Sequence, residues 1–484
     1  MNRMNSSAMY PNLINGSWVS ADDAITNINP SDLDDVVGIY ARATEDQVRE
    51  AIEGAGTAFE SWARVGIQER ADILDRVGSE ILARKNELGY LLSREEGKSL
   101  PEGIGEAARA GQIFRFFAAE ALRAHGEIVD SVRPGISVEI TREPVGVVGI
   151  ITPWNFPIAI PAWKIAPALA YGNCVVFKPA ELVPGCAWAL AEILVRAGIP
   201  PGVFNLVMGK GSVVGEVILK SSKVNAISFT GSQPIGARVV ALAGQHLAKV
   251  QLEMGGKNPL IIVDDGDIET AVTCAIQGAY FSTGQRCTAS SRFIVTKSIY
   301  EHFVNAVTDR LHRLKVDDAL APGTDIGPVV DERQFAQDVE YINIGKKEGA
   351  KLAVGGTRLN RTKRGHYLAP ALFTDSAPEM RINREEIFGP VASVIRVKDY
   401  EEALSVANGT PFGLCAGIVT KSLKLASHFK RNAQAGMVMV NLPTAGVDYH
   451  VPFGGRKGSS YGPREQGSYA REFFTIVKTA YVRP

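Results

Sequence analysis

Among the five cysteines of the chain, Cys287 lies in the segment best suited to a nucleophile. The segment Ser282–Ser290 is polar and follows a predicted helix, and Arg286 beside the cysteine would favour a reactive thiolate. Cys186 is a rival because it lies near the predicted start of a helix, where the dipole also favours an anion. The other three are expected to be small buried hydrophobic side chains: Cys174, Cys274 and Cys415. Local context therefore favours Cys287 and leaves Cys186 open.

Two glycine-containing loops could bind a phosphate group. Residues 209–215 nearly match the GxGxxG dinucleotide pattern but are one residue too long. Residues 229–236 follow a predicted strand and open a helix, and Ala237 stands where an ATP-binding P-loop needs lysine. Each loop alone could be an ordinary turn. Two of them on adjacent predicted strands favour a site for a dinucleotide pyrophosphate.

Two further polar residues lie where buried strands end. Asn155 lies between two prolines that fix the backbone, so its amide could donate to an anion, although a rigid turn explains the pattern equally. Glu253 ends an apolar segment beside two glycines. A carboxyl group there is either a solvated linker residue or a buried acid that needs a raised pKa or a partner.

The composition limits the class of protein. With 45% hydrophobic and 21% charged residues, the 484-residue chain can form two or three globular domains. The 52 basic and 52 acidic residues balance, which argues against nucleic acid or an anionic membrane surface as a partner. Few, widely spaced cysteines favour neither disulfides nor a metal site, so no metal is expected. Since no apolar run reaches ~18 residues and no secretory signal is evident, we expect a cytoplasmic protein.

The hydrophobic pattern predicts which elements position these residues. The first third reads as helix, over Thr44–Ala63 with a capping box, Gln68–Glu96 and Ile104–Arg123, followed by an exposed strand within Ser131–Arg142. From Val145 onward, short apolar strands alternate with helices, which predicts parallel α/β sheets. We expect two α/β domains that meet near residues 255–256. The apolar final strand, 475–482, needs a partner to cover it.

Seven motifs occur in the order found in the NAD(P)-dependent aldehyde dehydrogenase superfamily: TPWNFP, VVFKPAE, FTGSQPIG, LEMGGKNP, FSTGQRCT, EEIFGP and PFGGRKGSSYGPREQG. The resemblance runs from residues 14–18 to the final strand. It implies an α/β fold with a Rossmann-like NAD-binding domain (1–123 and 144–255) and an α/β catalytic domain (256–456). A small β oligomerisation element (124–143 and 470–484) would then form a homodimer or homotetramer.

The resemblance also implies a role for each motif residue. Cys287 matches the family nucleophile, Asn155 the oxyanion donor and Glu253 the general base. Lys164 and Glu465 match a pair associated with proton exit. The implied cofactor-binding residues are Ile151, Thr152, Pro153, Trp154, Lys178, Glu181, Gly211, Phe229, Gly231, Ser232, Ile235, Glu386 and Phe388. The implied substrate-binding residues are Arg286, Phe156, Trp163, Thr444, His450 and Phe453.

Two of these residues bear on cofactor and product. Glu181 would accept hydrogen bonds from the ribose hydroxyls and repel a 2′-phosphate, which favours NAD over NADP. The presence of Glu253 favours hydrolysis to a free acid, because relatives that acylate coenzyme A usually lack that base. The intact set of Cys287, Asn155 and Glu253 argues against a non-catalytic structural or binding member of the fold.

The substrate is predicted from three segments, residues 158–164, 284–287 and 458–467, which resemble bacterial α-ketoglutaric semialdehyde (2,5-dioxopentanoate) dehydrogenases. Succinate semialdehyde dehydrogenases usually carry arginine where Trp163 and Phe281 stand. Arg286 is then a candidate to bind an acidic group of a small anionic aldehyde, the alternative being a surface or inter-loop arginine. Other acidic aldehydes, such as succinate semialdehyde or sulfolactaldehyde, and a broad substrate range are the alternatives.

Overall fold

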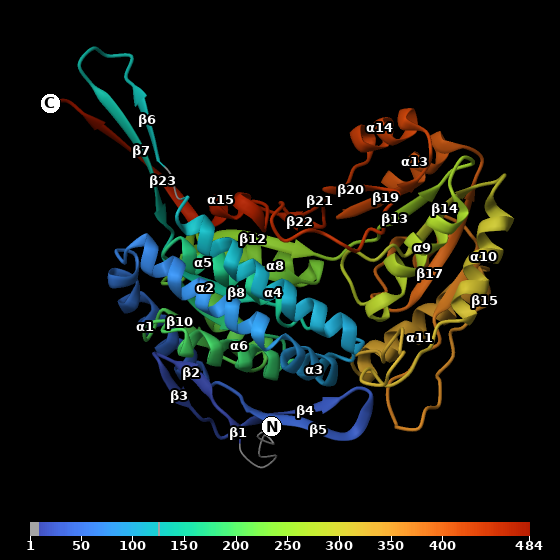
Figure 1. The fold of residues 1–484 in the computed structure, drawn as a ribbon, viewed down its shortest axis with the longest axis horizontal. Coiled ribbons are helices and arrows are strands. Elements are labelled where there is room, and N and C mark those ends of the chain that lie inside the picture. Colours follow the sequence, from blue (N-terminus) through green and yellow to red (C-terminus); the bar gives the residue numbers. More distant parts are fainter. Residues whose placement is uncertain (1–8, 124–125) are drawn as a thin grey trace.

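The computed structural model describes residues 9–123 and 126–484 and contains two large sheets (Figure 1). Residues 1–8 of the predicted NAD-binding domain and residues 124–125 of the predicted oligomerisation element lie outside the described residues. The first sheet has the order β22-β12-β11-β8-β9-β10-β2-β3. Its strands are β22 (Ser460–Tyr461), β12 (Lys249–Met254), β11 (Ala226–Gly231), β8 (Val147–Ile151), β9 (Cys174–Lys178), β10 (Phe204–Leu206), β2 (Asn12–Ile14) and β3 (Ser17–Val19).

The five central strands of this sheet, from β12 to β10, run parallel, as the continuous apolar sequence predicts. The helices that connect its strands are α5 (Ala159–Ala170), α6 (Pro184–Arg196), α7 (Glu216–Lys220) and α8 (Gln233–Ala243), with a π-helical turn η1 (Gly211–Gly215) before α7. Parallel strands end at one edge of a sheet, where α/β proteins bind their ligands. The motifs containing Asn155, Lys178, Ser232 and Glu253 therefore lie at or near strand ends on this edge.

The second sheet has the order β15-β16-β17-β14-β13-β19-β20. Its strands are β15 (Lys351–Val354), β16 (Ala371–Ser376), β17 (Val391–Val397), β14 (Arg292–Thr296), β13 (Pro259–Ile262), β19 (Cys415–Val419) and β20 (Met437–Val440), and only β15 pairs antiparallel among them. The helices of this part are α9 (Ile268–Ala279), α10 (Tyr300–His312), α11 (Glu332–Lys347), α12 (Arg381–Arg384), α13 (Tyr400–Asn408) and α14 (Leu423–Asn432). Since β12 ends the first sheet's main run at Met254 and β13 begins at Pro259, the chain passes between the sheets at residues 255–258.

The prediction that the first third is helical is only partly right. The helix α1 (Glu45–Trp62) begins with the expected capping box at Thr44, and α4 (Leu100–Ala121) matches the third predicted helix. The second predicted helix is two helices, α2 (Ile67–Ala83) and α3 (Lys85–Glu96), that meet at Arg84. Before α1 the chain forms short strands, and β4 (Ala24–Asn29) and β5 (Asp32–Ala41) form a small sheet with β1 (Met9–Tyr10). The burial of β4 alternates strictly, but asparagine occupies two of its buried positions, so the apolar alternation typical of a strand is weak in its sequence.

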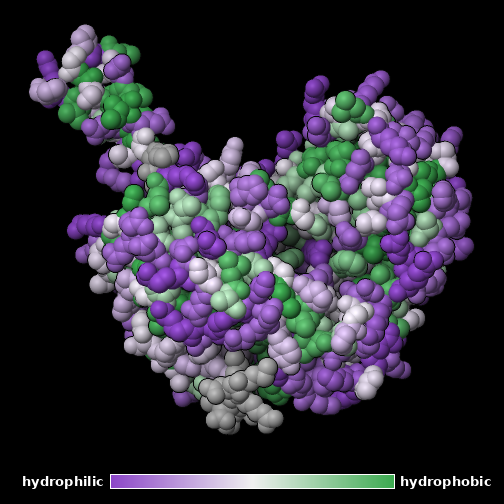
Figure 2. Space-filling view, viewed as in Figure 1, coloured by the Kyte–Doolittle hydropathy of each residue, from purple (hydrophilic) through white to green (hydrophobic). Residues whose placement is uncertain are grey.

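A three-stranded sheet projects from the body of the molecule as an arm (Figure 1). Its strands are β6 (Glu127–Asp130), β7 (Ser137–Pro144) and the final strand β23 (Thr475–Val482), which pairs antiparallel with β7 along its whole length. Apolar residues gather on this arm in the space-filling view (Figure 2). The final strand thus has the partner that the sequence called for, and the predicted α/β fold with a small β element is confirmed.

Candidate active site

The loop that carries Cys287 follows α9 and a short 3-10 turn, η3 (Phe281–Gly284). The backbone turns sharply here, because Ser282, Thr283 and Gly284 all have positive φ angles of 51°, 58° and 66°. Such angles strain residues other than glycine, and they often occur at functional sites. The Asn258 Nδ2 atom donates to the Cys287 carbonyl oxygen over 2.8 Å and anchors the loop to the start of the second sheet.

Burial raises the pKa of the Cys287 thiol to about 12, and the nearby Glu253 and Glu386 carboxyls add to the rise. The expectation that Arg286 favours the thiolate stays a prediction, and its guanidinium group pairs with Glu102 in this geometry. Cys186 is fully buried, and burial together with Glu95 raises its thiol pKa well above the usual value. Cys287 lines a cavity and Cys186 does not, so Cys287 is the accessible thiol of the two.

Asn155 reaches the cysteine loop directly. The residue is 2% exposed, and its Nδ2 atom donates to the Gln285 carbonyl oxygen over 2.9 Å, two residues before the nucleophile. An amide nitrogen has two donors, so one N–H remains to meet an oxyanion.

The Asn155 backbone is held in turn by Lys98, whose Nζ atom donates to the Asn155 carbonyl oxygen over 2.8 Å. Lys98 also forms a buried pair with Glu106 at 2.7 Å, and Glu106 accepts from the backbone N–H groups of Ile158 and Ala159. This network fixes the loop on which the amide lies.

Glu253 lies near the end of β12, is 3% exposed and accepts a hydrogen bond of 2.6 Å from Ser460 Oγ. Burial raises the pKa of its carboxyl well above the usual value, and the Glu465 carboxylate adds to the rise. Lys164 on α5 contacts Glu465 directly and donates to Ser228 Oγ over 2.8 Å. The predicted base and the predicted proton-exit pair therefore form one buried group of charges.

At the nicotinamide end of the predicted cofactor site, residues that follow strands of the first sheet meet residues from the segment before β17. Trp154, after β8, packs edge to face against Phe388 from the loop before β17, with ring centroids 5.5 Å apart. Glu386 accepts from the Gly256 backbone N–H over 2.9 Å, and burial raises its carboxyl pKa to about 7. The Phe229 ring folds against Gly231, where a Cβ would lie 2.5 Å from it, so a larger residue would force the ring to move.

The adenosine end of this predicted site contains Lys178 and Glu181. Lys178 Nζ donates to the Pro179 carbonyl oxygen over 2.6 Å, and burial lowers the ammonium pKa to about 8. A Cβ atom added to Gly211 would lie 4.0 Å from Cε of Lys178, so the two residues are neighbours. Glu181 lies 3.3 Å from Arg42 Nε, a contact that the sequence did not predict.

The remaining predicted cofactor residues lie at the starts of helices and the ends of strands. Ser232 directly precedes α8, and Ile235 within α8 is 48% exposed. The Thr152 N–H donates to the Lys178 carbonyl oxygen over 3.2 Å, which connects the segments that follow β8 and β9.

A cavity of about 180 Å³ opens onto Cys287 and contains four of the six predicted substrate residues, Arg286, Phe156, Trp163 and Phe453. The rings of Trp163 and Phe453 stack, with their centroids 5.4 Å apart.

Two of the predicted substrate residues, Thr444 and His450, find no support in this geometry. Thr444 is fully buried and donates to the Thr288 carbonyl oxygen over 2.7 Å, and the exposed His450 is also absent from the described residues that line the cavity. The neighbouring residues 445–447 form this wall instead.

Sequence reasoning missed three charged residues of this region: Arg109, which lines the cavity, and the buried pair Lys98 and Glu106, which holds the Asn155 loop. Glu106 and Arg109 lie three residues apart on α4, among alanine and phenylalanine positions that are buried. Charged residues within the apolar stripe of a predicted helix were the available signal, because such groups are seldom buried without a purpose.

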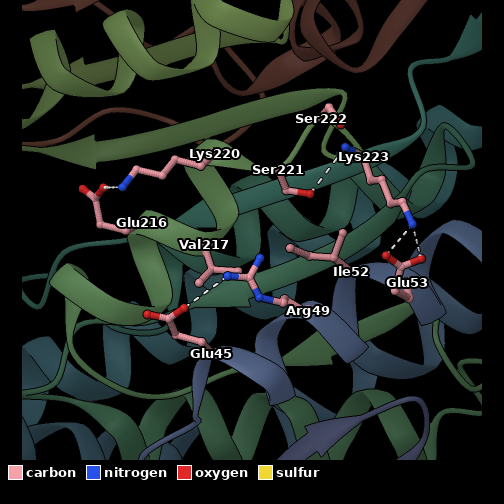
Figure 3. A pocket seen from close by; sticks show the side chains of 10 residues that line it. All are labelled: Glu45, Arg49, Ile52, Glu53, Glu216, Val217, Lys220, Ser221, Ser222 and Lys223. Atoms are coloured by element: carbon pink, nitrogen blue, oxygen red, sulfur yellow. Dashed lines mark hydrogen bonds and ion pairs between the residues drawn. The ribbon is translucent and has the colours of Figure 1, made fainter.

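A second cavity, of about 380 Å³, lies between α1 and α7 at the surface (Figure 3). Its charges pair with one another: Glu45 with Arg49 at 3.1 Å, Glu216 with Lys220 at 2.9 Å, and Glu53 with Lys223. Among the described residues, no cysteine lines this second cavity, whereas Cys287 lines the first. The first cavity is therefore the candidate reaction site.

Two further properties concern the described residues as a whole. Within 9–123 and 126–484, no group of three or more His, Cys, Asp or Glu side chains could hold a metal ion. In the same ranges, no helix has both the length and the apolar content required to cross a membrane.

An accessible thiol, an amide donor and a buried carboxyl lie together between a Rossmann-like sheet and a second α/β sheet, an arrangement that suits a cysteine-dependent oxidoreductase of aldehydes. The sequence pattern of the aldehyde dehydrogenase family matches residues 18–480, and the chain belongs to this family. It is 44% identical over 480 residues to an α-ketoglutaric semialdehyde dehydrogenase of Bacillus subtilis, covering 98% of both chains. It is 42% identical to an α-ketoglutarate semialdehyde dehydrogenase of Haloferax volcanii, covering 97% of this chain and 98% of the other.

Solved structures agree with this assignment. A betaine aldehyde dehydrogenase of Staphylococcus aureus in complex with NAD+ superposes with a TM-score of 0.95 at 34% identity, covering 98% of this chain and 95% of the other. An NADP-dependent enzyme of Escherichia coli gives 0.95 at 33% identity, with 98% of each chain covered. The protein is an aldehyde dehydrogenase, and its reaction is the NAD(P)-dependent oxidation of an aldehyde.

Proposed function

We propose that the protein oxidises a small acidic semialdehyde to the carboxylic acid with NAD+, and that α-ketoglutaric semialdehyde is its first candidate substrate. The observation that carries the proposal is the cavity beside Cys287, which two arginines line together with aromatic side chains. A cation and an apolar wall suit a short aldehyde that carries a carboxylate at its other end. The semialdehyde dehydrogenases of B. subtilis and H. volcanii support the same substrate.

The residues present fit a dinucleotide. Lys178 uses one of its three donors on a backbone carbonyl, which leaves two for ribose hydroxyls. The α8 N-terminus, with the Ser232 hydroxyl unused as a cap, suits a pyrophosphate, and Trp154 and Phe388 flank the nicotinamide end. Bound NAD+ supplies the acceptor for the hydride.

Each residue of the catalytic centre has a distinct role in this reaction. The Cys287 thiol gives up its proton to water, its sulfur bonds to the aldehyde carbon, and the Asn155 amide and the Cys287 N–H stabilise the resulting oxyanion. Loss of hydride from that carbon leaves a thioester on Cys287. Glu253 then takes a proton from water, the hydroxyl oxygen bonds to the carbonyl carbon, and the C–S bond breaks to release the acid. Lys164 and Glu465 provide a route for the proton that Glu253 takes up.

Glu253 also supports hydrolysis as the step that ends the reaction. A buried carboxyl with a raised pKa is a stronger base when ionised than an exposed one, as activation of water requires. Transfer of the acyl group to coenzyme A would need no such base. We therefore propose a free acid as the product.

An aldehyde panel tests this function by NADH absorbance. α-Ketoglutaric semialdehyde, succinate semialdehyde, betaine aldehyde and hexanal are compared at matched NAD+ concentration. The highest kcat/KM should belong to an acidic aldehyde, with α-ketoglutaric semialdehyde first. Equal values for hexanal would instead indicate a broad-range enzyme.

We also propose that the arm formed by β6, β7 and β23 joins subunits into a homodimer or homotetramer. Its apolar side chains are exposed in the single chain: Ile128 is 80% and Tyr481 62% exposed. Exposed apolar strands in a folded protein usually meet a partner. Tyr481→Asp should shift the protein toward monomers in size-exclusion chromatography with light scattering, and an unchanged mass would argue against this interface.

A further inference from the structure

Two arginines line the cavity beside Cys287, and they differ in what already holds them. Arg286 Nη2 lies 2.6 Å from Glu102 Oε1 and donates to Ser282 Oγ over 2.7 Å. This pair links the cysteine loop to α4. The buried Nε of Arg286 has no partner among the described residues, but the ion pair with Glu102 balances its charge inside the protein, and its Nη2 donors fix the loop.

Arg109 lies on α4, and within 9–123 and 126–484 no carboxylate oxygen lies within 4.0 Å of its guanidinium nitrogens. Its Nη2 atom donates over a long 3.3 Å to the neutral Gln466 side chain, and among the described residues its buried Nε has no partner. Its guanidinium group lies 5.9 Å from the Trp163 ring centroid. Arg109 is thus a largely buried cation with unused donors that faces the reaction cavity.

The acidic groups nearest to Arg109 do not supply its counter-charge. Glu106 pairs with Lys98 at 2.7 Å, and Asp448 is exposed on the opposite loop. Burial lowers the pKa of the Arg109 guanidinium group, yet an arginine stays charged throughout the physiological range. A buried unpaired cation is costly, and a ligand that brings a carboxylate removes that cost.

We propose that Arg109 binds the carboxylate of the acidic aldehyde and so sets substrate specificity, whereas Arg286 is a positioning residue for the cysteine loop. The proposal rests on the proposed function, since it names the group that recognises an acidic substrate. The planar guanidinium suits a carboxylate because it can donate two parallel hydrogen bonds. Trp163 and Phe453 would pack along the carbon chain between that carboxylate and Cys287.

The test compares two substrates of similar length, α-ketoglutaric semialdehyde and pentanal, in three variants. Arg109→Met keeps length and removes charge, Arg109→Lys keeps charge, and Arg286→Met is the matched control. For Arg109→Met the ratio of kcat/KM for the acidic over the neutral aldehyde should fall by about 30-fold or more, mostly through KM. Arg109→Lys should restore part of that ratio. Arg286→Met should lower kcat for both aldehydes and leave the ratio within about threefold of the wild type.

The outcomes separate the two proposals. If Arg286→Met lowers the ratio and Arg109→Met does not, Arg109 is not the specificity residue, although the acidic substrate stands. If the wild type has equal kcat/KM values for the acidic and the neutral aldehyde, the proposed function is wrong, whatever the variants show. Glutarate as a competitive inhibitor gives a second measurement: its inhibition constant should rise in Arg109→Met. An unchanged constant overturns the proposal even where turnover of the variant is low.

Discussion

The catalytic centre and the adenosine end of the cofactor site are held in different ways. Around Cys287 the polar groups are buried and tied to backbone atoms of neighbouring loops, as Asn155 is to Gln285. Around Glu181 the partner is the partly exposed side chain of Arg42, from a distant part of the sequence. Buried groups with fixed partners should respond strongly to substitution, and exposed ion pairs weakly. The two regions therefore predict a graded series of effects.

The largest effect is expected for Cys287→Ala, which removes the atom that bonds to the substrate. Turnover should fall on the order of 10⁴-fold or more, with no burst of NADH in the first turnover. NAD+ binding, measured by fluorescence titration, should persist. Cys274→Ala, at a buried cysteine of α9, is the matched control and should remain active. A burst in Cys287→Ala would contradict its role as nucleophile.

Glu253→Gln should separate the two halves of the reaction. Steady-state turnover should fall by about 10²- to 10⁴-fold, while a burst of about one NADH per site persists because only hydrolysis needs the base. In the wild type, kcat should rise with pH through the raised carboxyl pKa, because the base acts in its ionised form. Stopped-flow absorbance measures both. Loss of the burst together with turnover would place Glu253 in the first half-reaction.

Asn155→Ala should lower kcat by about 10²- to 10³-fold, because removal of one donor from a buried oxyanion site costs roughly 3–4 kcal/mol. The KM for NAD+ should change little. Turnover close to that of the wild type would show that the backbone N–H of Cys287 suffices to stabilise the oxyanion.

Lys98→Met should lower kcat by about tenfold, because the carbonyl of Asn155 loses its buried donor and the amide is positioned less well. A single change leaves Glu106 as an uncompensated buried charge, so the melting temperature should fall as well. The double variant Lys98→Met/Glu106→Gln removes that charge and is the control for stability. If the double variant regains both stability and full kcat, Lys98 has no positioning role.

The smallest effect is expected at the adenosine end. Arg42 partly neutralises Glu181, so Arg42→Ala should strengthen repulsion of a 2′-phosphate and raise the kcat/KM preference for NAD over NADP by up to about fivefold. Arg49→Ala, at an exposed arginine of α1, is the control and should leave the ratio unchanged (Figure 3). A shift toward NADP in Arg42→Ala would contradict this account of Glu181.

The sequence by itself determined the α/β class, the capped helix at Thr44 and the family motifs that carry Cys287, Asn155 and Glu253. These features are local, because a strand, a cap or a motif is written in adjacent residues or in short periods. The N-terminal strands were missed although Ala24–Asn29 alternates buried and exposed positions, because polar asparagine and threonine occupy three of its six positions and hide the apolar period.

Only the tertiary structure decided which charges meet. Arg286 follows Glu102 by 184 residues in sequence, and Arg42 and Glu181 are likewise far apart, yet both pairs are in contact. Spacing along the chain carries no information about such partners, because they form where elements far apart in the sequence pack together. For the same reason Arg286, beside the nucleophile in sequence, is held by α4, while Arg109, far from it in sequence, faces the cavity.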